Sequence, residues 1–145
     1  MKFVIQRVTH ASVTVDNEVI GKINKGFMVL IGVEDADTIA IADKMVSKLV
    51  NMRVFEDENG KMNLALKDVG GELLLISQFT LYADCKKGNR PSFVEAANPE
   101  MANELYEYFM DECRKEGIIV EKGEFGAHME VSLLNNGPVT IILEK

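Results

Sequence analysis

The sequence has few of the residues on which disulfide, metal and triad sites depend. Its two cysteines, Cys85 and Cys113, lie far apart and form no CxxC pair, so neither a disulfide framework nor a zinc site is indicated. Its two histidines, His10 and His128, show neither metal-ligand spacing nor a Ser-His-Asp arrangement. We therefore expect no bound metal and reduced thiols, as is typical of a cytoplasmic protein.

Long apolar runs are also absent. No run approaches the roughly 20 residues that cross a bilayer, and residues 1–7 lack the apolar centre of a secretory signal. The chain has 145 residues, of which 47% are hydrophobic, and this is enough to bury a core as one domain over residues 1–145. We expect a soluble, cytoplasmic domain with no membrane partner.

Positive charge is scarce as well, because 16 lysines and arginines stand against 23 acidic residues and give a net charge of -7. This balance argues against broad nucleic-acid binding, and we expect no DNA partner. The local exception is residues 86–90, where three cations fall within five residues, although a solvated loop explains them equally well. No Walker or dinucleotide glycine loop is present, so we expect no nucleotide cofactor.

What the chain does contain is strand and helix periodicity that predicts an α/β fold. Residues 3–15 and 19–23 alternate as two strands of a hairpin. Arg7 falls on the same face as Phe3 and Ile5. It either reaches the solvent at the sheet edge, which is the commoner outcome, or is held inside by carbonyl or carboxylate acceptors.

Two main helices are predicted. The first runs to Met52 and is capped by Asp35 or Asp37. The second begins at Asn98-Pro99 and ends at Gly117. Its apolar stripe includes Cys113, which we expect to be packed rather than reactive.

The remaining strands complete a mixed, largely antiparallel sheet. Asn59-Gly60 predicts an acidic hairpin, and the apolar residues 73–76 predict a buried central strand. Further strands are expected at residues 27–33, 118–120, 129–134 and 139–143.

Two short stretches carry unusual chemistry. Polar residues end the central strand at Ser77-Gln78-Phe79-Thr80. If the strand alternation continued, they would lie on both faces, so either a pocket opens there or local hydrogen bonds satisfy them. Gly137-Pro138 lies between two strand-like runs. Its spacing favours a tight hairpin turn over residues 135–138, and the alternative is a tip that presents bare carbonyls to a ligand.

Both stretches, residues 77–81 and 136–140, resemble the signatures of the D-aminoacyl-tRNA deacylases, also called D-tyrosyl-tRNA deacylases. The resemblance extends to Arg7, to residues 88–93 and to residues 125–127 with Met129. It implies a homodimer of α/β/β layers with a barrel-like sheet. It also implies a hydrolase that cleaves the ester between a D-amino acid and the 3′ end of tRNA, with glycyl-tRNA as a further possible substrate.

The resemblance also implies roles for individual residues. The catalytic set is Gln78, Phe79 and Thr80. The substrate-binding set is Ser77, Leu81, Arg90, Phe93 and Met129. Gly137 and Pro138, joined by a cis peptide bond, would enter the partner subunit's site and exclude L side chains. The residues that support this loop would be Arg7, Asn136, Val139 and Thr140.

Two mechanisms and two other functions stay open at this point. Thr80 is either a nucleophile or a pocket residue beside backbone N–H groups, with the terminal 2′-hydroxyl of the tRNA assisting the reaction.

This chain differs from the family pattern at two positions, because the family usually has Asp at the position of Asn136 and often has Asp at the position of His128. The first alternative function is a non-catalytic dimeric module that binds small molecules or RNA ends. The second is a Thr- or Ser-dependent hydrolase of another ester.

Overall fold

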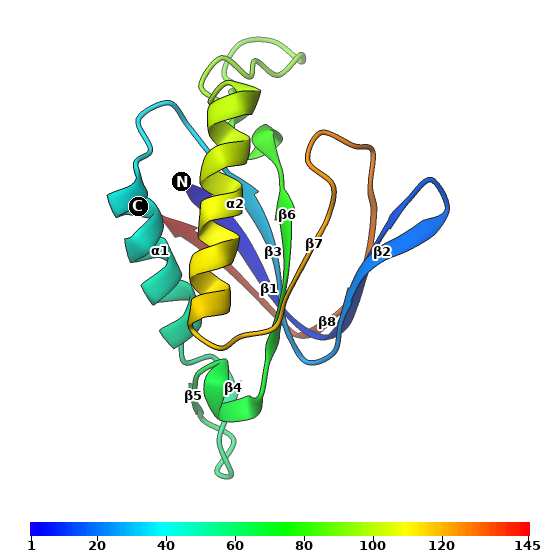
Figure 1. Cartoon of the computed structure of the whole chain (residues 1–145), viewed down its shortest axis with the longest axis vertical. Helices are drawn as coiled ribbons and strands as arrows, with labels where there is room; N and C mark the ends of the chain where they lie inside the picture. Colours follow the sequence, from blue (N-terminus) through cyan, green and yellow to red (C-terminus); the bar gives the residue numbers. More distant parts are fainter.

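The computed structural model describes residues 1–145 and has two helices packed on one side of a strongly curved sheet (Figure 1). The elements in chain order are β1 (Lys2–Val15), β2 (Glu18–Ile23), β3 (Gly26–Gly32), α1 (Ile39–Asn51), β4 (Phe55–Glu56), β5 (Met62–Leu64), η1 (Lys67–Val69), β6 (Glu72–Ser77), η2 (Phe79–Tyr82), α2 (Pro99–Lys115), β7 (Val120–Lys122) and β8 (Glu130–Glu144). The predicted α/β class with two main helices is confirmed.

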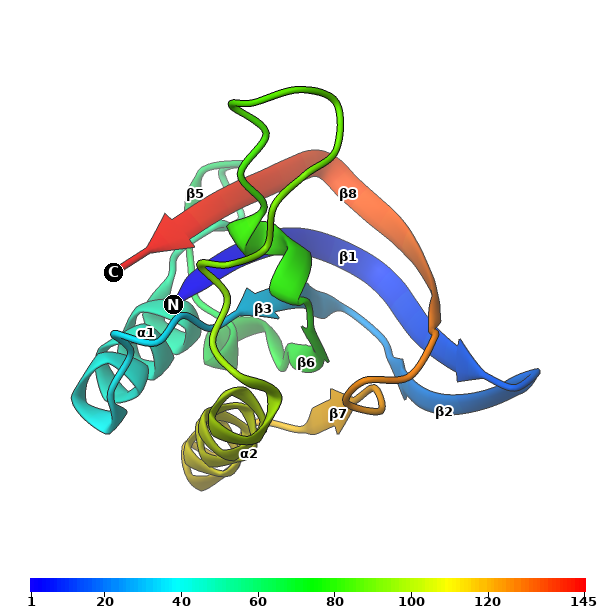
Figure 2. The same ribbon diagram turned by 90° about the horizontal axis from the view of Figure 1, so that it is seen from above.

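The sheet is organised by β1, the 14-residue strand at its centre. One edge of β1 pairs with β3 through its first half and with β2 through its second half, while the other edge pairs with β8. These three pairings are antiparallel, whereas β3 with β6 and β6 with β7 are parallel. The sheet is therefore mixed and largely antiparallel, and its curvature makes it barrel-like (Figure 2).

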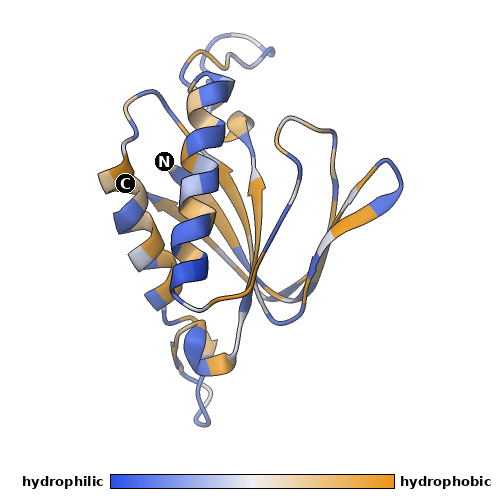
Figure 3. Ribbon diagram, in the orientation of Figure 1, coloured by the Kyte–Doolittle hydropathy of each residue, from blue (hydrophilic) through white to orange (hydrophobic).

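The core has two parts, one on each face of β6. Leu73 and Leu75 face the larger cluster, which packs the helices against the sheet. Leu74 and Ile76 face a smaller cluster that includes Val13 from β1. Because β6 is covered on both faces, it is a continuous apolar run, as predicted for residues 73–76 (Figure 3). This arrangement gives the three layers of the fold.

The start of α1 differs from the prediction. Thr38 is the N-cap, and its Oγ1 accepts a hydrogen bond from the N–H of Ile41 at 3.3 Å. Asp37 instead lies buried beside the amino group of Met1 and accepts a hydrogen bond from Lys145. Burial alone would raise the pKa of Asp37, but its hydrogen bonds and ion pairs hold the pKa below its usual value. The carboxylate is thus used for a buried ion pair and not for a cap.

Three other local predictions are confirmed. Asn98 caps α2 by accepting the N–H of Met101 at 3.0 Å, and Pro99 occupies the first turn. Strands β4 and β5 form the predicted hairpin around Gly60. Cys113 is buried, which raises the pKa of its thiol to about 12. None of the helices combines the length and the apolar character needed to cross a membrane.

The hairpin turn predicted at residues 135–138 is wrong. Strand β8 runs through the Gly-Pro segment without reversing, because both of its halves pair with β1 and not with each other. Gln6 is opposite Thr140 and Val8 is opposite Asn135, so residues 136–139 stand opposite Arg7 alone. The segment is therefore a bulge within one long strand, with four residues opposite one.

Candidate active site

The polar end of β6 forms the wall of a cavity. The strand stops at Ser77 and the chain turns into η2, so the alternation considered for Gln78 and Thr80 does not continue. The N–H of Gln78 donates to the carbonyl of Ile31 at 2.7 Å and fixes the turn to β3. Phe79 begins η2, so its N–H has no partner within that turn.

The cavity has a volume of about 600 Å³ and is mainly apolar. Its lining comes from the end of β6, the start of α2 and the segment before β8. The lining residues are Val33, Ser77, Gln78, Phe79, Phe93, Ala96, Ala97, Asn98, Pro99, Ala102, Phe125, Gly126, Ala127 and Met129. None of these side chains titrates, so the cavity contains no acid, base or charged group of its own.

The cavity gathers some of the predicted site residues but not all of them. Ser77, Gln78, Phe79, Phe93 and Met129 line it together. Three other residues predicted from the same motifs are not among its lining residues, namely Thr80, Leu81 and Arg90.

Several lining residues were missed by sequence reasoning. Asn98 and Pro99 gave a clear helix-start signal, but that signal says nothing about a cavity. Val33 and Ala102 gave no signal beyond being apolar.

Aromatic side chains form the rim of the cavity. The rings of Phe79 and Phe93 meet edge to face with centroids 5.2 Å apart, yet 55% and 38% of these residues stay exposed. Met129, another lining residue, packs against Gly123, where an added Cβ would lie 2.4 Å from its sulfur. Exposed aromatic rings at a cavity mouth provide a surface on which a flat ligand can stack.

The hydroxyl of Thr80 has one polar partner, because it accepts a hydrogen bond from the Gln78 amide nitrogen. Thr80 is exposed. No histidine or carboxylate is hydrogen-bonded to it, so the geometry provides no general base for this hydroxyl.

A basic loop lies between η2 and α2. It is closed by paired backbone hydrogen bonds between Asp84 and Ser92, at 2.8 and 2.9 Å. Lys86, Lys87 and Arg90 are exposed on it and none forms an ion pair. The loop projects away from the sheet (Figures 1 and 2). Because its end carries Phe93, the three cations lie on a segment that also forms the cavity rim.

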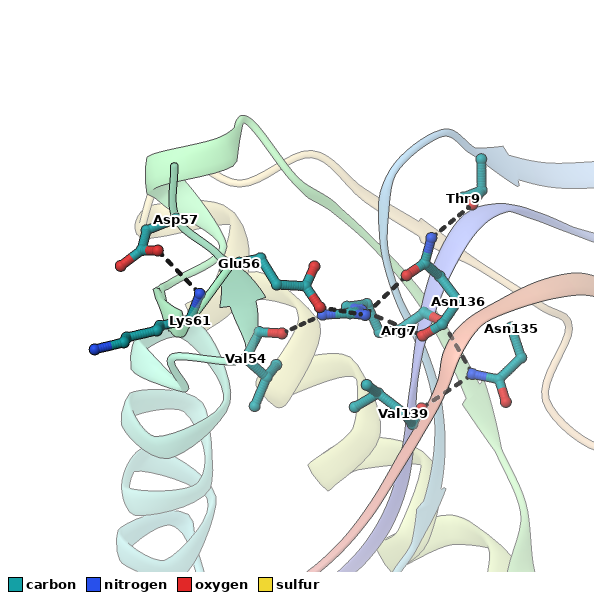
Figure 4. Close-up of polar contacts among 9 residues, drawn as sticks. All are labelled: Arg7, Thr9, Val54, Glu56, Asp57, Lys61, Asn135, Asn136 and Val139. Carbon is teal, nitrogen blue, oxygen red and sulfur yellow. Dashed lines mark hydrogen bonds and ion pairs between the residues drawn. The ribbon is translucent and has the colours of Figure 1, made fainter. Parts of the chain in front are cut away.

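Arg7 is the centre of the second motif. It is only 4% exposed, so it is held inside, the less common of the two outcomes considered. Its Nε donates to the carbonyl of Asn136 at 3.2 Å, and its Nη2 donates to the side-chain oxygen of Asn136 at 2.8 Å. The remaining acceptors are the carbonyl of Val54 at 2.6 Å and the carboxylate of Glu56 at 3.1 Å (Figure 4). Arg7 thus connects β1, the bulge and the β4 segment.

The bulge itself presents Gly137 and Pro138 to the surface. The bond between them is cis. Gly137 has a φ of +124°, and an added Cβ would lie 2.7 Å from the nitrogen of Val139, so only glycine fits. Asn135 closes the base of the bulge by donating from its amide to the carbonyls of Arg7 and Val139, at 3.1 and 3.0 Å.

The two motifs do not meet within one chain. Lys2 lies 5.3 Å from the ring centroid of Tyr82 in η2, and the bulge faces Arg7. Arg7 lies five positions after Lys2 on β1, and at roughly 3.3 Å per residue this is about 17 Å along the strand. Gly137 and Pro138 are not among the lining residues of the cavity.

Comparison with known proteins gives the class of this chain. The family model for D-Tyr-tRNA(Tyr) deacylase matches residues 4–144. A D-aminoacyl-tRNA deacylase of Clostridioides difficile (strain 630) is 56% identical over 144 residues, covering 99% of this chain and 97% of that protein. One from Lactobacillus gasseri is 57% identical and 99% of each chain is covered. The chain therefore belongs to the D-aminoacyl-tRNA deacylase family, which is a family of hydrolases.

Two solved structures share the fold. One, described as c-Myc DNA Unwinding Element Binding Protein, superposes with a TM-score of 0.94 at 45% identity and covers 100% of this chain and 99% of that one. The other, a probable eukaryotic D-amino acid tRNA deacylase, has a TM-score of 0.81 at 18% identity, covering 98% and 97%, and supports the fold alone.

Proposed function

We propose that this chain hydrolyses the ester bond of D-aminoacyl-tRNA in the cytoplasm and releases the D-amino acid and free tRNA. The observation that carries the proposal is the cavity formed by Ser77, Gln78 and Phe79, in a chain that belongs to this family over nearly its whole length. Its apolar lining and aromatic rim suit the terminal adenosine and the attached amino acid.

The chemistry proposed for this cavity uses the backbone and the substrate. None of the lining side chains titrates, and Thr80 has no base, so a Thr nucleophile lacks the means of activation. We assign the assisting group to the terminal 2′-hydroxyl of the tRNA, which is adjacent to the ester and therefore already in place. The N–H groups of Phe79 and Thr80 would stabilise the negative charge that develops on the carbonyl oxygen. Gln78 would orient Thr80 as a pocket residue.

Stereochemical selection is assigned to the bulge of a second copy of the chain. Gly137 and Pro138 stand opposite Arg7 and do not line the cavity of their own chain, so we assign them to the cavity of another subunit. Exposed apolar residues lie on β8 on both sides of the bulge: Leu134 is 53% exposed and Ile142 is 66% exposed, which suits burial in a homodimer. In the partner's cavity the bulge carbonyls would hold the substrate amino group and leave no room for an L side chain.

The remaining proposed roles follow from position. Leu81 in η2 and Arg90 on the basic loop would contact the terminal nucleotide, while Met129 and Phe93 form walls of the cavity. Val139 and Thr140 continue the strand after the bulge, and the Thr140 hydroxyl donates to the carbonyl of Pro138 at 3.3 Å.

RNA is the proposed nucleic-acid partner, although the name of one solved relative refers to the binding of a DNA element. The net charge of -7 disfavours a long duplex contact. The exposed cations Lys86, Lys87 and Arg90 lie on the segment that leads to the cavity rim. These cations could pair with a few phosphates of the tRNA next to its terminal adenosine.

One experiment tests reaction, stereochemistry and mechanism together. Deacylation is measured in parallel on D-tyrosyl-, L-tyrosyl- and glycyl-tRNA, and repeated with tRNA ending in 2′-deoxyadenosine. We expect release of the D-amino acid, no release of the L enantiomer and cleavage of glycyl-tRNA, which has no side chain to exclude. Equal rates for both enantiomers would contradict the proposal. Saturable tRNA binding without turnover would identify a non-catalytic binding module instead.

A further inference from the structure

The hydrogen-bond network around the guanidinium of Arg7 contains one charged acceptor. Three of the four acceptors of its guanidinium are neutral: the carbonyl of Val54 and the carbonyl and side-chain oxygens of Asn136. The fourth is the carboxylate of Glu56, 3.1 Å from Nη2. A buried guanidinium is costly unless it is paired with an opposite charge. Glu56 therefore provides the neutralising charge.

Glu56 belongs to the β4–β5 hairpin and not to the sheet that carries the bulge (Figure 4). The residue before it, Phe55, is buried and stacks on Phe27 with centroids 5.1 Å apart. The residue after it, Asp57, accepts the N–H groups of Asn59 and Lys61 at 2.9 and 3.0 Å. Glu56 is thus fixed from both sides by contacts that do not involve the bulge.

Asp57 keeps its charge in this turn. A hydrogen bond from the Asn63 amide, together with the backbone N–H of Lys61, lowers the pKa of Asp57. The hairpin backbone on both sides of Glu56 is consequently held by contacts that are independent of the bulge.

We propose that Glu56 is a positioning residue for stereochemical selection, acting through Arg7 on the Gly137-Pro138 bulge. This inference rests on the proposed function, because it assigns the selector to the bulge. Without the carboxylate, the guanidinium turns toward solvent and its two hydrogen bonds to Asn136 loosen. The bulge carbonyls then lose their fixed orientation, and an L side chain meets a weaker steric barrier.

The geometry also provides a rescue. The side-chain oxygen of Asn136 already lies 2.8 Å from Nη2, so Asn136→Asp would place a carboxylate on Arg7 from the bulge itself. If Glu56 acts by neutralising Arg7, that second carboxylate replaces it. If Glu56 only stabilises the hairpin, a carboxylate on β8 cannot compensate.

The test measures kcat/KM on D-tyrosyl-tRNA and L-tyrosyl-tRNA for the full-length wild type and four variants. These are Glu56→Ala, Glu56→Gln, the double variant Glu56→Ala with Asn136→Asp, and the control Glu58→Ala. Glu58 is exposed on the same hairpin and has no hydrogen-bond or ion-pair partner. Half of the Glu56 side chain is exposed, so its variants are expected to fold, and thermal unfolding of each preparation checks this.

We expect Glu56→Ala to lower the D-to-L ratio at least about tenfold, the effect of losing one charge-assisted hydrogen bond, and Glu56→Gln to fall between it and the wild type. Glu58→Ala should stay within about twofold of the wild type, and the double variant should recover most of the ratio. A wild-type ratio in Glu56→Ala, or a lost ratio that Asn136→Asp fails to restore, would overturn the role of Glu56. A wild type that does not discriminate would remove the proposed function as well.

Discussion

The first motif opens onto a cavity with no titratable side chain, and the second surrounds a buried arginine. Around residues 77–80 the side chains are neutral and partly exposed, and the hydroxyl of Thr80 has a single amide partner. Around residues 136–139 the guanidinium of Arg7 makes four hydrogen bonds to three residues. The cavity thus offers space and backbone groups, whereas the bulge is held in one orientation.

The difference fits two kinds of task. A reacting group that comes with the substrate requires little side-chain chemistry from the protein, but it requires donors placed for the developing charge. Exclusion of an enantiomer requires a surface that does not yield, because a mobile wall would accommodate the wrong side chain. A buried arginine in which each of the three guanidinium nitrogens donates a hydrogen bond supplies that rigidity.

The strongest test of this contrast removes the substrate's own hydroxyl. With tRNA ending in 2′-deoxyadenosine, we expect kcat on D-tyrosyl-tRNA to fall by about a thousandfold, because an adjacent hydroxyl has a high effective concentration. Thr80→Ala should keep activity within about fivefold, since loss of one neutral hydrogen bond has a small effect. Single-turnover rates of both reactions provide the comparison. A Thr80→Ala loss as large as that of the deoxy substrate would reassign Thr80 as the nucleophile.

The second test removes the guanidinium of Arg7 and its hydrogen bonds to the bulge. Arg7→Ala leaves the carboxylate of Glu56 and the carbonyls of Val54 and Asn136 without their donor. We expect the free energy of unfolding to fall by about 3 kcal/mol, as for breaking a buried charged network. Urea unfolding followed by circular dichroism measures this.

The matched control for Arg7 is Arg53→Ala. Arg53 is exposed and forms no hydrogen bond or ion pair through its side chain, so its removal should change stability by less than about 0.5 kcal/mol. If both variants unfold at the same urea concentration, the bulge is not braced by Arg7 and the contrast between the two motifs fails.

The third test separates selectivity from stability within the bulge. Pro138 is exposed, so Pro138→Ala removes little packing from its own chain. We expect the D-to-L ratio of kcat/KM to fall by about tenfold while the unfolding free energy changes by less than about 1 kcal/mol. Deacylation assays and urea unfolding on one preparation give both numbers. If Pro138→Ala keeps the wild-type D-to-L ratio, the bulge has no role in stereochemical selection.

Much of the fold could be predicted because its signals are local. The caps of α2, the Gly60 hairpin and the apolar run of β6 each depend on a few neighbouring residues, and the structure confirms them. The continuity of β8 could not be predicted in this way. Gly137-Pro138 has the local signature of a turn, and only pairing of both flanks with β1, more than 110 residues earlier, makes it a bulge.

The site shows the same division. The first motif marked three residues that line the cavity, yet Asn98 and Pro99 complete it from a helix start whose sequence signal concerned only capping. The burial of Arg7 depends on Val54 and Glu56, which are 47 and 49 residues away along the chain. Such acceptors are known only once the fold brings them together, so from the sequence the edge position was the more common expectation.

The smallest expected effect concerns the lysines of the basic loop, which line neither the cavity nor the bulge. If Lys86 and Lys87 each neutralise one phosphate near the 3′ end, replacing both with alanine should lower the slope of log K against log salt by about 1.4, at roughly 0.7 per contact on a single strand. The slope is measured from the affinity for tRNA without an attached amino acid, at salt concentrations between 50 and 200 mM. Lys44→Ala with Lys48→Ala, two exposed lysines of α1, provides the charge-matched control. The D-to-L ratio of kcat/KM should not change in either double variant, because the tRNA makes the same phosphate contacts whichever enantiomer it carries. An equal drop in slope for both pairs would mean that tRNA responds to total charge and not to this loop.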